Sequence, residues 1–237
     1  MGNRFAELNR WFETPLGQRL LSEEAHVLQQ VLPHLFGYHL LQIDCIGHGY
    51  LLESSRIMHR CILTRDANTM INKPYSKILA LADALPFAHD SLDVVVLPHI
   101  LEFEDNPHEI LREVERVLIP EGYMVILGFN PMSLWGAWHW IPTQRKTAPW
   151  CRRFLPLLRI KDWLALLNFE VTEQQTFFFT LPFYSGHPNN YTKYLEKPGL
   201  HWTSNLGAVY MLVAKKRVVT LTRIREPRWL AQPALAT

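Results

Sequence analysis

Two apolar strands joined by one amphipathic helix, between residues 92 and 129, constrain the fold of this chain more than any other feature. The run 92–97 is nearly all apolar and rich in β-branched residues, as in a strand that a parallel sheet buries on both faces. Asp105-Asn106-Pro107 then supplies an N-cap followed by proline, which predicts a helix that Pro120-Glu121-Gly122 ends. Residues 123–129 form the second strand. The pattern predicts a right-handed βαβ crossover.

The carboxyl ends of these two strands are the first candidate site. They read Leu97-Pro98-His99 and Gly128-Phe129-Asn130. In an open parallel sheet, the backbone just beyond the strand ends faces the crevice in which ligands bind. We therefore expect both segments to line one crevice.

Three stretches of this region carry a family resemblance: LPF at 85–87, SLDVVVLPHILEF at 91–103 and DNPHEILREVERVLIPEGYMVI at 105–126. In order and spacing they resemble the second half of a class I S-adenosylmethionine-dependent methyltransferase domain of the type 11 group. LPHILEF and GFNPMSLWG further resemble a bacterial subgroup of that family. The resemblance runs from about Leu40 to about Lys216. It implies an α/β fold with a seven-stranded, mostly parallel, doubly wound Rossmann-like sheet and an antiparallel last strand.

Length and composition are consistent with one methyltransferase-like domain over residues 1–237. We divide it into an N-terminal helical cap at 1–38, a core at 39–216 and a basic tail at 217–237. The cap contains two helical patterns within residues 3–36, broken at Thr14-Pro15. Further expected elements are helices at 51–56, 67–71 and 160–167, strands at 59–64, 77–81 and 169–179, and a last strand at 207–215 antiparallel to its predecessor.

Charge and cysteine content limit which partners and which cellular compartment the sequence predicts. A net charge of +2 does not indicate a nucleic-acid partner for the whole chain. The tail carries Lys215, Lys216, Arg217, Arg223, Arg225 and Arg228, opposed only by Glu226, so RNA binding is an alternative to a solvated tail. Three cysteines without a disulfide spacing, no signal-like start and no apolar run of about 18 residues predict a cytoplasmic protein without a transmembrane segment. A homodimer is left open.

Motifs of several other catalytic classes are missing from the sequence. There is no Cys-x-x-Cys pair, His-Glu-x-x-His, phosphate-binding loop or Gly-x-Ser-x-Gly elbow. We therefore expect no metal site, and no nucleotide triphosphatase or serine hydrolase chemistry.

The cofactor loop implied by the resemblance follows the first strand, at Cys45-Ile46-Gly47-His48-Gly49. Glycines there let the chain turn sharply and let the backbone approach a ligand without a Cβ in the way. The family pattern is acid-x-Gly-x-Gly-x-Gly, and the sequence departs from it in two registers. Either Gln42 takes the acidic position and Asp44 and Ile46 replace glycines, or Cys45 replaces the first glycine and Ile43 the acid.

Residues near the next two strand ends are implied to hold the adenosine moiety. In the family an acid ends the second strand and binds the ribose hydroxyls; Thr64 stands nearest that position, and Asp66 either takes the role or is only a helix N-cap. Asp83 is displaced by two from the usual adenine-binding acid, and the backbone of Ala82 and Asp83 could serve instead.

His99 is the candidate catalytic residue, because a neutral-range pKa suits proton transfer in an apolar crevice. The equal alternative is a buried histidine that holds the loop. Leu97 and Pro98 match family positions beside the cofactor's methionine.

Aromatic side chains suggest an acceptor pocket. We assign Trp11, Asn130, Trp135 and Tyr184 to it, because a dense aromatic loop at the carboxyl edge of a sheet suits a pocket or lid. The alternative is a patch for a partner or a membrane surface.

These residues together predict an enzyme that transfers a methyl group from S-adenosylmethionine to a small-molecule acceptor. The alternative is a catalytically degenerate methyltransferase fold that binds a metabolite or a protein. The altered cofactor loop keeps this alternative open.

Overall fold

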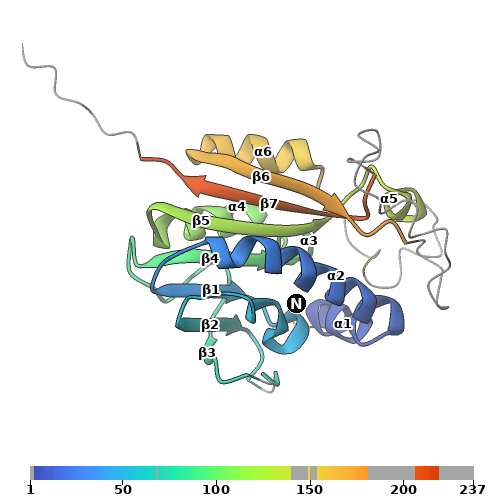
Figure 1. The fold of residues 1–237 in the computed structure, drawn as a ribbon, viewed down its shortest axis with the longest axis horizontal. Helices are drawn as coiled ribbons and strands as arrows, with labels where there is room; N and C mark the ends of the chain where they lie inside the picture. The colour runs from blue at the N-terminus through green and yellow to red at the C-terminus, as the bar shows by residue number, and fades with distance from the viewer. Residues whose placement is uncertain are drawn as a thin grey trace, which may run out of the picture.

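The computed structural model is built around one central β-sheet (Figure 1). The structure describes residues 3–67, 69–71, 73–139, 149, 154–180 and 206–218. The strands of this sheet are β1 His39–Ile43, β2 His59–Thr64, β3 Ser76–Leu79, β4 Leu92–Pro98, β5 Leu118–Phe129, β6 Phe169–Phe177 and β7 Val209–Lys216. Their order across the sheet is β3-β2-β1-β4-β5-β7-β6.

Strand directions confirm the expected fold class. β1 to β5 pair in parallel, whereas β7 runs antiparallel to both β5 and β6. The last strand is therefore inserted between β5 and β6, with Phe129 level with Val209 at the carboxyl end of β5. The order reverses between β1 and β4, and such a switch point is where open α/β sheets bind ligands.

Helices cover both faces of the sheet. They are α1 Asn3–Phe12, α2 Pro15–Val31, α3 Ile100–Phe103, α4 Pro107–Val117, α5 Leu134–His139 and α6 Leu157–Leu166, with 3₁₀ turns η1 Leu32–His34 and η2 Ile46–Leu52. α2 packs with Leu40, Val94 and Val96 in one core cluster. α4 and α6 pack with Leu41, Val95 and Leu97 in the other. Alternate strand residues thus face opposite layers, as the apolar runs predicted.

The helical cap forms as expected, with its break at Thr14-Pro15. The Thr14 hydroxyl caps α2 by accepting a hydrogen bond from the Gly17 N–H at 3.2 Å, and Pro15 begins the helix. In Figure 1, α1 and the start of α2 lie at the same end of the sheet as α5, the end at which β5 finishes. The cap is therefore close to the carboxyl edge of the sheet.

Two predicted helices are wrong. The helix expected at 51–56 does not form: residues 51 and 52 end the 3₁₀ turn η2, whose backbone has positive φ angles at Gly47, His48 and Gly49, and residues 53–56 are turn and irregular chain. Residues 67 and 69–71 of the second expected helix form no helix. By contrast, Asn168 has a φ of 59° and ends α6 in the left-handed conformation, as predicted.

The first basic residues of the tail form ion pairs that the sequence did not indicate. Lys215 pairs with Glu121 at 2.7 Å, Lys216 with Asp90 at 3.0 Å, and Arg217 with Glu170 at 2.6 Å. The expectation that only Glu226 opposes this charge is therefore wrong for these three residues, because strand pairing brings distant acids beside them. Arg223, Arg225, Arg228 and Glu226 lie outside the described residues. In the described part of the chain, no helix is long and apolar enough to cross a membrane.

Candidate active site

The loop that leaves β1 has the backbone shape of a ligand-binding turn. Asp44, Gly47 and Gly49 have φ angles of 71°, 70° and 89°. Aspartate is one of the few residues with a side chain that visits this region, so Asp44 can stand where a glycine would be expected. A Cβ added at Gly47 would lie 2.7 Å from Leu21 Cδ1, which places α2 directly on the loop.

Gln42, inside β1, holds this loop with its side chain. The amide is fully buried, and its Nε2 donates to the carbonyl oxygens of Asp44 at 2.8 Å and Ile46 at 3.2 Å. Its Oε1 is buried with no hydrogen-bond partner among the residues that the structure describes. Gln42 therefore shapes the loop and leaves one acceptor unused.

Asp44 is a buried acid at the turn. Its carboxylate accepts a hydrogen bond from the Cys45 N–H at 2.5 Å. Burial raises the pKa of Asp44 to about 6, against opposing contributions from that hydrogen bond and from Arg65, while Glu104 adds to the rise. Arg65 and Glu104 also form an ion pair with each other. Since β1 lies between β2 and β4, this pair joins the segments that follow β2 and α3, on either side of Asp44.

His99 sits at the end of β4 between two acids, completely buried. Its Nε2 lies 2.6 Å from Glu24 Oε1 and its Nδ1 lies 3.3 Å from Glu102 Oε2. Burial alone would lower the pKa of His99, but the carboxylates of Glu24 and Glu102 raise it to about 9. Glu102 also accepts the Phe129 N–H at 2.5 Å, which ties β4 to the end of β5.

This geometry favours the anchoring alternative for His99, because both ring nitrogens are engaged and the side chain has no exposed surface. A catalytic role for His99 stays a prediction. Glu24 was not singled out from the sequence. The sequence feature that could have identified Glu24 is a carboxylate within the otherwise apolar buried face of α2.

The predicted adenosine contacts lie around the ends of β2 and β3. Thr64 is buried, and its hydroxyl pairs with Thr69 Oγ1 at 3.1 Å and with the Asp66 N–H at 3.3 Å. Asp66 and Asp83 are exposed, and Ala82 is buried. Leu97 and Pro98 are buried at the end of β4. The structure thus gathers the predicted cofactor residues along the carboxyl edge formed by β2, β1 and β4.

Two of the predicted acceptor residues, Trp11 and Trp135, meet beyond β5. The Trp11 ring packs edge-on against Phe129 and Trp135, with centroids 6.3 and 5.8 Å away. Asn130 serves the turn instead of facing the crevice: its Nδ2 donates to the Gly207 carbonyl at 2.9 Å and its Oδ1 accepts the Met132 N–H at 3.0 Å. Tyr184 lies outside the described residues.

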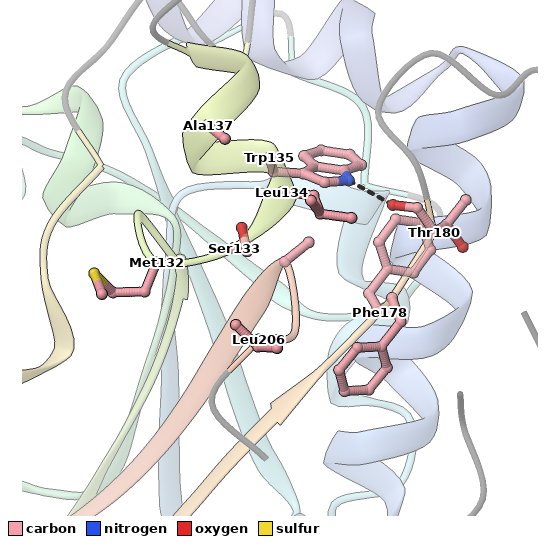
Figure 2. Close-up of a pocket in the computed structure, with 10 residues that line it drawn as sticks. Met132, Ser133, Leu134, Trp135, Ala137, Phe178, Thr180 and Leu206 are labelled. Atoms are coloured by element: carbon pink, nitrogen blue, oxygen red, sulfur yellow. Dashed lines mark hydrogen bonds between the residues drawn. The ribbon is translucent and has the colours of Figure 1, made fainter. Parts of the chain in front are cut away.

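A cavity of about 370 Å³ lies beside Trp135 (Figure 2). Trp135 and Phe178 stand against it, and the Trp135 Nε1–H donates to the Thr180 carbonyl at 2.7 Å. Its lining is mostly apolar and consists of Met132, Ser133, Leu134, Trp135, Ala137, Phe178, Phe179, Thr180, Leu206 and Ala208. Trp135 therefore contacts both Trp11 and this mostly apolar cavity.

Comparison with known proteins agrees with this architecture. Residues 48–126 match the family model described as a methyltransferase domain. The chain is 33% identical over 212 residues to the uncharacterised protein YafS of Escherichia coli, covering 90% of this chain and 82% of that protein. A Thermotoga maritima S-adenosylmethionine-dependent methyltransferase, a possible histamine N-methyltransferase, superposes with a TM-score of 0.67 at 20% identity, covering 90% of this chain and 96% of that one. An Archaeoglobus fulgidus S-adenosylmethionine-dependent methyltransferase gives 0.60 at 18% identity, covering 81% and 92%.

Proposed function

Because this chain belongs to the type 11 group of class I S-adenosylmethionine-dependent methyltransferases, we propose that it transfers a methyl group from that cofactor to a small-molecule acceptor. The observation that carries the proposal is the turn after β1. Its left-handed backbone at Asp44, Gly47 and Gly49 lies at the switch point of the sheet, where a ligand can approach the backbone closely.

The residues present fit the methionine half of the cofactor. The loop has no Cβ at Gly47 and Gly49, and the buried oxygens Gln42 Oε1 and Glu24 Oε2 lack hydrogen-bond partners in the described part of the chain. A polar ligand would satisfy these oxygens. For the adenosine half, the carboxylates of Asp66 and Asp83 are exposed and could accept hydrogen bonds from ribose or adenine.

The chain's own contribution would be positioning. When bound, the cofactor supplies a sulfonium-activated methyl group, so the protein need only hold a nucleophile in line with it. The Glu24–His99–Glu102 cluster fixes the relative positions of α2, β4 and the end of β5. The apolar cavity beside Trp135 would hold an apolar portion of the acceptor and exclude water from it.

Calorimetric titration with S-adenosylmethionine and S-adenosylhomocysteine tests the cofactor assignment. We expect binding well below 1 mM for both. No binding at about 1 mM, which corresponds to roughly −4 kcal/mol, would contradict the enzyme assignment. Product analysis by mass spectrometry, with pools of small molecules as acceptors, would then identify the transfer.

Gly47→Val tests the loop within this proposal. A valine cannot easily adopt a φ of 70°, and its side chain would meet Leu21. We expect S-adenosylhomocysteine binding to be lost while the cooperative unfolding transition remains. Met58→Val, at a side chain that is 87% exposed before β2, is the matched control and should bind normally. Unchanged affinity in Gly47→Val would mean that the loop does not hold the cofactor.

A second function, a non-catalytic binding module, is favoured by one specific observation. Arg65 and Glu104 pair across the end of β1, and the Thr64 hydroxyl is turned inward to Thr69, so this chain's own groups engage one another on the adenosine side. Under this alternative, neither cofactor form would bind, and Arg65→Ala would leave that unchanged. Binding that appears or strengthens in Arg65→Ala would instead show that the ion pair restricts a genuine cofactor site.

A further inference from the structure

Two buried oxygen atoms near the switch point lack hydrogen-bond partners among the residues that the structure describes: Glu24 Oε2 and Gln42 Oε1. Both side chains have no exposed surface. The orientation of the Gln42 amide is fixed, because its nitrogen must donate to two carbonyl oxygens. Both unpaired atoms are therefore acceptors, and leaving a buried acceptor unpaired is unfavourable.

The two residues lie on the same side of the sheet at the same edge. Side chains alternate along β1, so Gln42 shares a face with Leu40, which packs in the core cluster that α2 covers. The Gln42 amide reaches forward to the carbonyl oxygens of Asp44 and Ile46, at the carboxyl end of β1.

α2 extends between the two loops of the switch point. Leu21 lies on Gly47, in the loop after β1, whereas Glu24 reaches His99, directly after β4. Residues three apart share one side of a helix, so Leu21 and Glu24 lie on the side of α2 that packs on the loop after β1 and on the residue after β4. Glu24 is thus the carboxyl group that α2 brings to the point where ligands bind in such sheets.

Charge indicates what these acceptors would bind. One imidazole ring lies between two buried carboxyl groups, so a singly charged His99 leaves the cluster with an excess negative charge or an extra proton. A compact cation with several N–H donors suits a free carboxylate oxygen and a free amide oxygen at the same edge of the sheet, and it would balance the charge. An ammonium group has three such donors and no acceptor.

We propose that Glu24 and Gln42 bind the α-ammonium group of the cofactor's methionine moiety, so that the helical cap recognises the cofactor's charge. This inference rests on the proposed function. It assigns Glu24 of α2 as a binding residue, and it gives the cap a role in the site beyond covering the sheet. His99 then acts as a positioning residue that orients the Glu24 carboxylate through its Nε2.

A cycle of two ligands and two proteins tests the assignment. The ligands are S-adenosylhomocysteine and its analogue in which hydrogen replaces the α-amino group. The proteins are the wild type and Glu24→Gln, with Glu23→Gln as the matched control because Glu23 is the exposed neighbour on the same helix. Dissociation constants come from calorimetry, and unfolding midpoints check the fold.

We expect the wild type to bind the deamino analogue roughly tenfold or more weakly than S-adenosylhomocysteine, as is typical for loss of a charged hydrogen bond. Glu24→Gln should weaken S-adenosylhomocysteine by a similar factor and change the analogue by no more than about twofold. Glu23→Gln should behave as the wild type. If Glu24→Gln unfolds, the comparison of the two ligands on the wild type, which needs no variant, decides the inference.

Two results would overturn the inference while leaving the proposed function intact. One is equal binding of the two ligands by the wild type; the other is equal weakening of both ligands in the variant, which would make Glu24 a structural residue whose free oxygen binds water. Failure of the wild type to bind S-adenosylhomocysteine at all would instead contradict the proposed function itself, and the inference with it.

Discussion

Among single residues, Asp44 combines a left-handed backbone with a buried carboxyl group at the turn after β1. Its pKa is raised to about 6, chiefly by burial, so the charged form that predominates at neutral pH lowers the stability of the folded state. Natural sequences depart from locally favourable choices most often at functional sites. Asp44 is therefore a residue at which stability and binding are expected to conflict.

Asp44→Asn should stabilise the protein at neutral pH. Because the folded pKa lies above the ordinary value, the folded state binds the proton more tightly, and this contribution to stability is present below about pH 4 and lost as pH rises through about 6. Asparagine carries no charge and tolerates a positive φ. We expect a gain of roughly 1–3 kcal/mol in the free energy of unfolding at pH 7.5.

Urea unfolding at pH 7.5 and pH 4 measures this effect. The gain should shrink at pH 4, where Asp44 is protonated in the folded state. Asp162→Asn, on the exposed side of α6, is the control and should change stability by less than about 0.5 kcal/mol at either pH. A gain of equal size at both pH values would rule out the buried charge as its cause.

At the scale of elements, the corner between α1 and α2 determines how the cap meets the sheet. Trp11 and Phe12 end α1 against aromatic neighbours, and Phe12 packs 5.8 Å from the His99 ring. Gly17 allows this close approach, because a Cβ there would lie 2.3 Å from the Trp11 carbonyl oxygen. The position of Glu24 thus depends on a glycine near the start of the same helix.

Gly17→Ala should therefore destabilise the protein despite the better helix propensity of alanine. The contacts are with backbone atoms of Trp11 and Phe12, so no side-chain rotation relieves them, and overpacking of this kind costs typically 1–3 kcal/mol. Thermal and urea unfolding report the loss. Ser22→Ala, at an exposed position of α2, is the control. A variant as stable as the wild type would show that α1 can shift away from α2 freely.

In the whole molecule, the cap, the β1 loop and the segment after β4 meet at the candidate site. A ligand there would contact segments from across residues 21–99 and would stabilise all of them together. S-adenosylhomocysteine at about 100 times its dissociation constant should add about 2.7 kcal/mol to the free energy of unfolding. For a chain of this length, that corresponds to an increase of roughly 5–10 °C in the unfolding midpoint.

Differential scanning fluorimetry over a range of ligand concentrations checks this prediction. The midpoint should rise with the logarithm of ligand concentration in the wild type and stay constant in Gly47→Val. Adenosine alone is the ligand control and should produce a smaller shift, because it lacks the methionine moiety. A shift of the same size in Gly47→Val would place the ligand elsewhere.

Local sequence patterns were enough to predict the sheet and the edge at which the candidate site lies. Val94, Val95, Val96 and Leu97 alternate between the two core clusters, because successive side chains of a strand point to opposite faces of the sheet. The same local pattern places LPHILEF and the β1 loop at strand ends. Local sequence did not predict η2, in which three residues have positive φ angles and which the structure has where a helix was expected to begin.

Which side chains meet one another depends on contacts between distant parts of the chain. Glu24 and His99 are 75 positions apart, and no local pattern pairs them; the fold does so by laying α2 over the ends of β1 and β4. The insertion of β7 between β5 and β6 likewise depends on long-range pairing, as does the neutralisation of Lys215 to Arg217. The spacing of apolar residues predicts which side of a helix or strand is buried, whereas the residues that pack against that side depend on the fold of the whole chain.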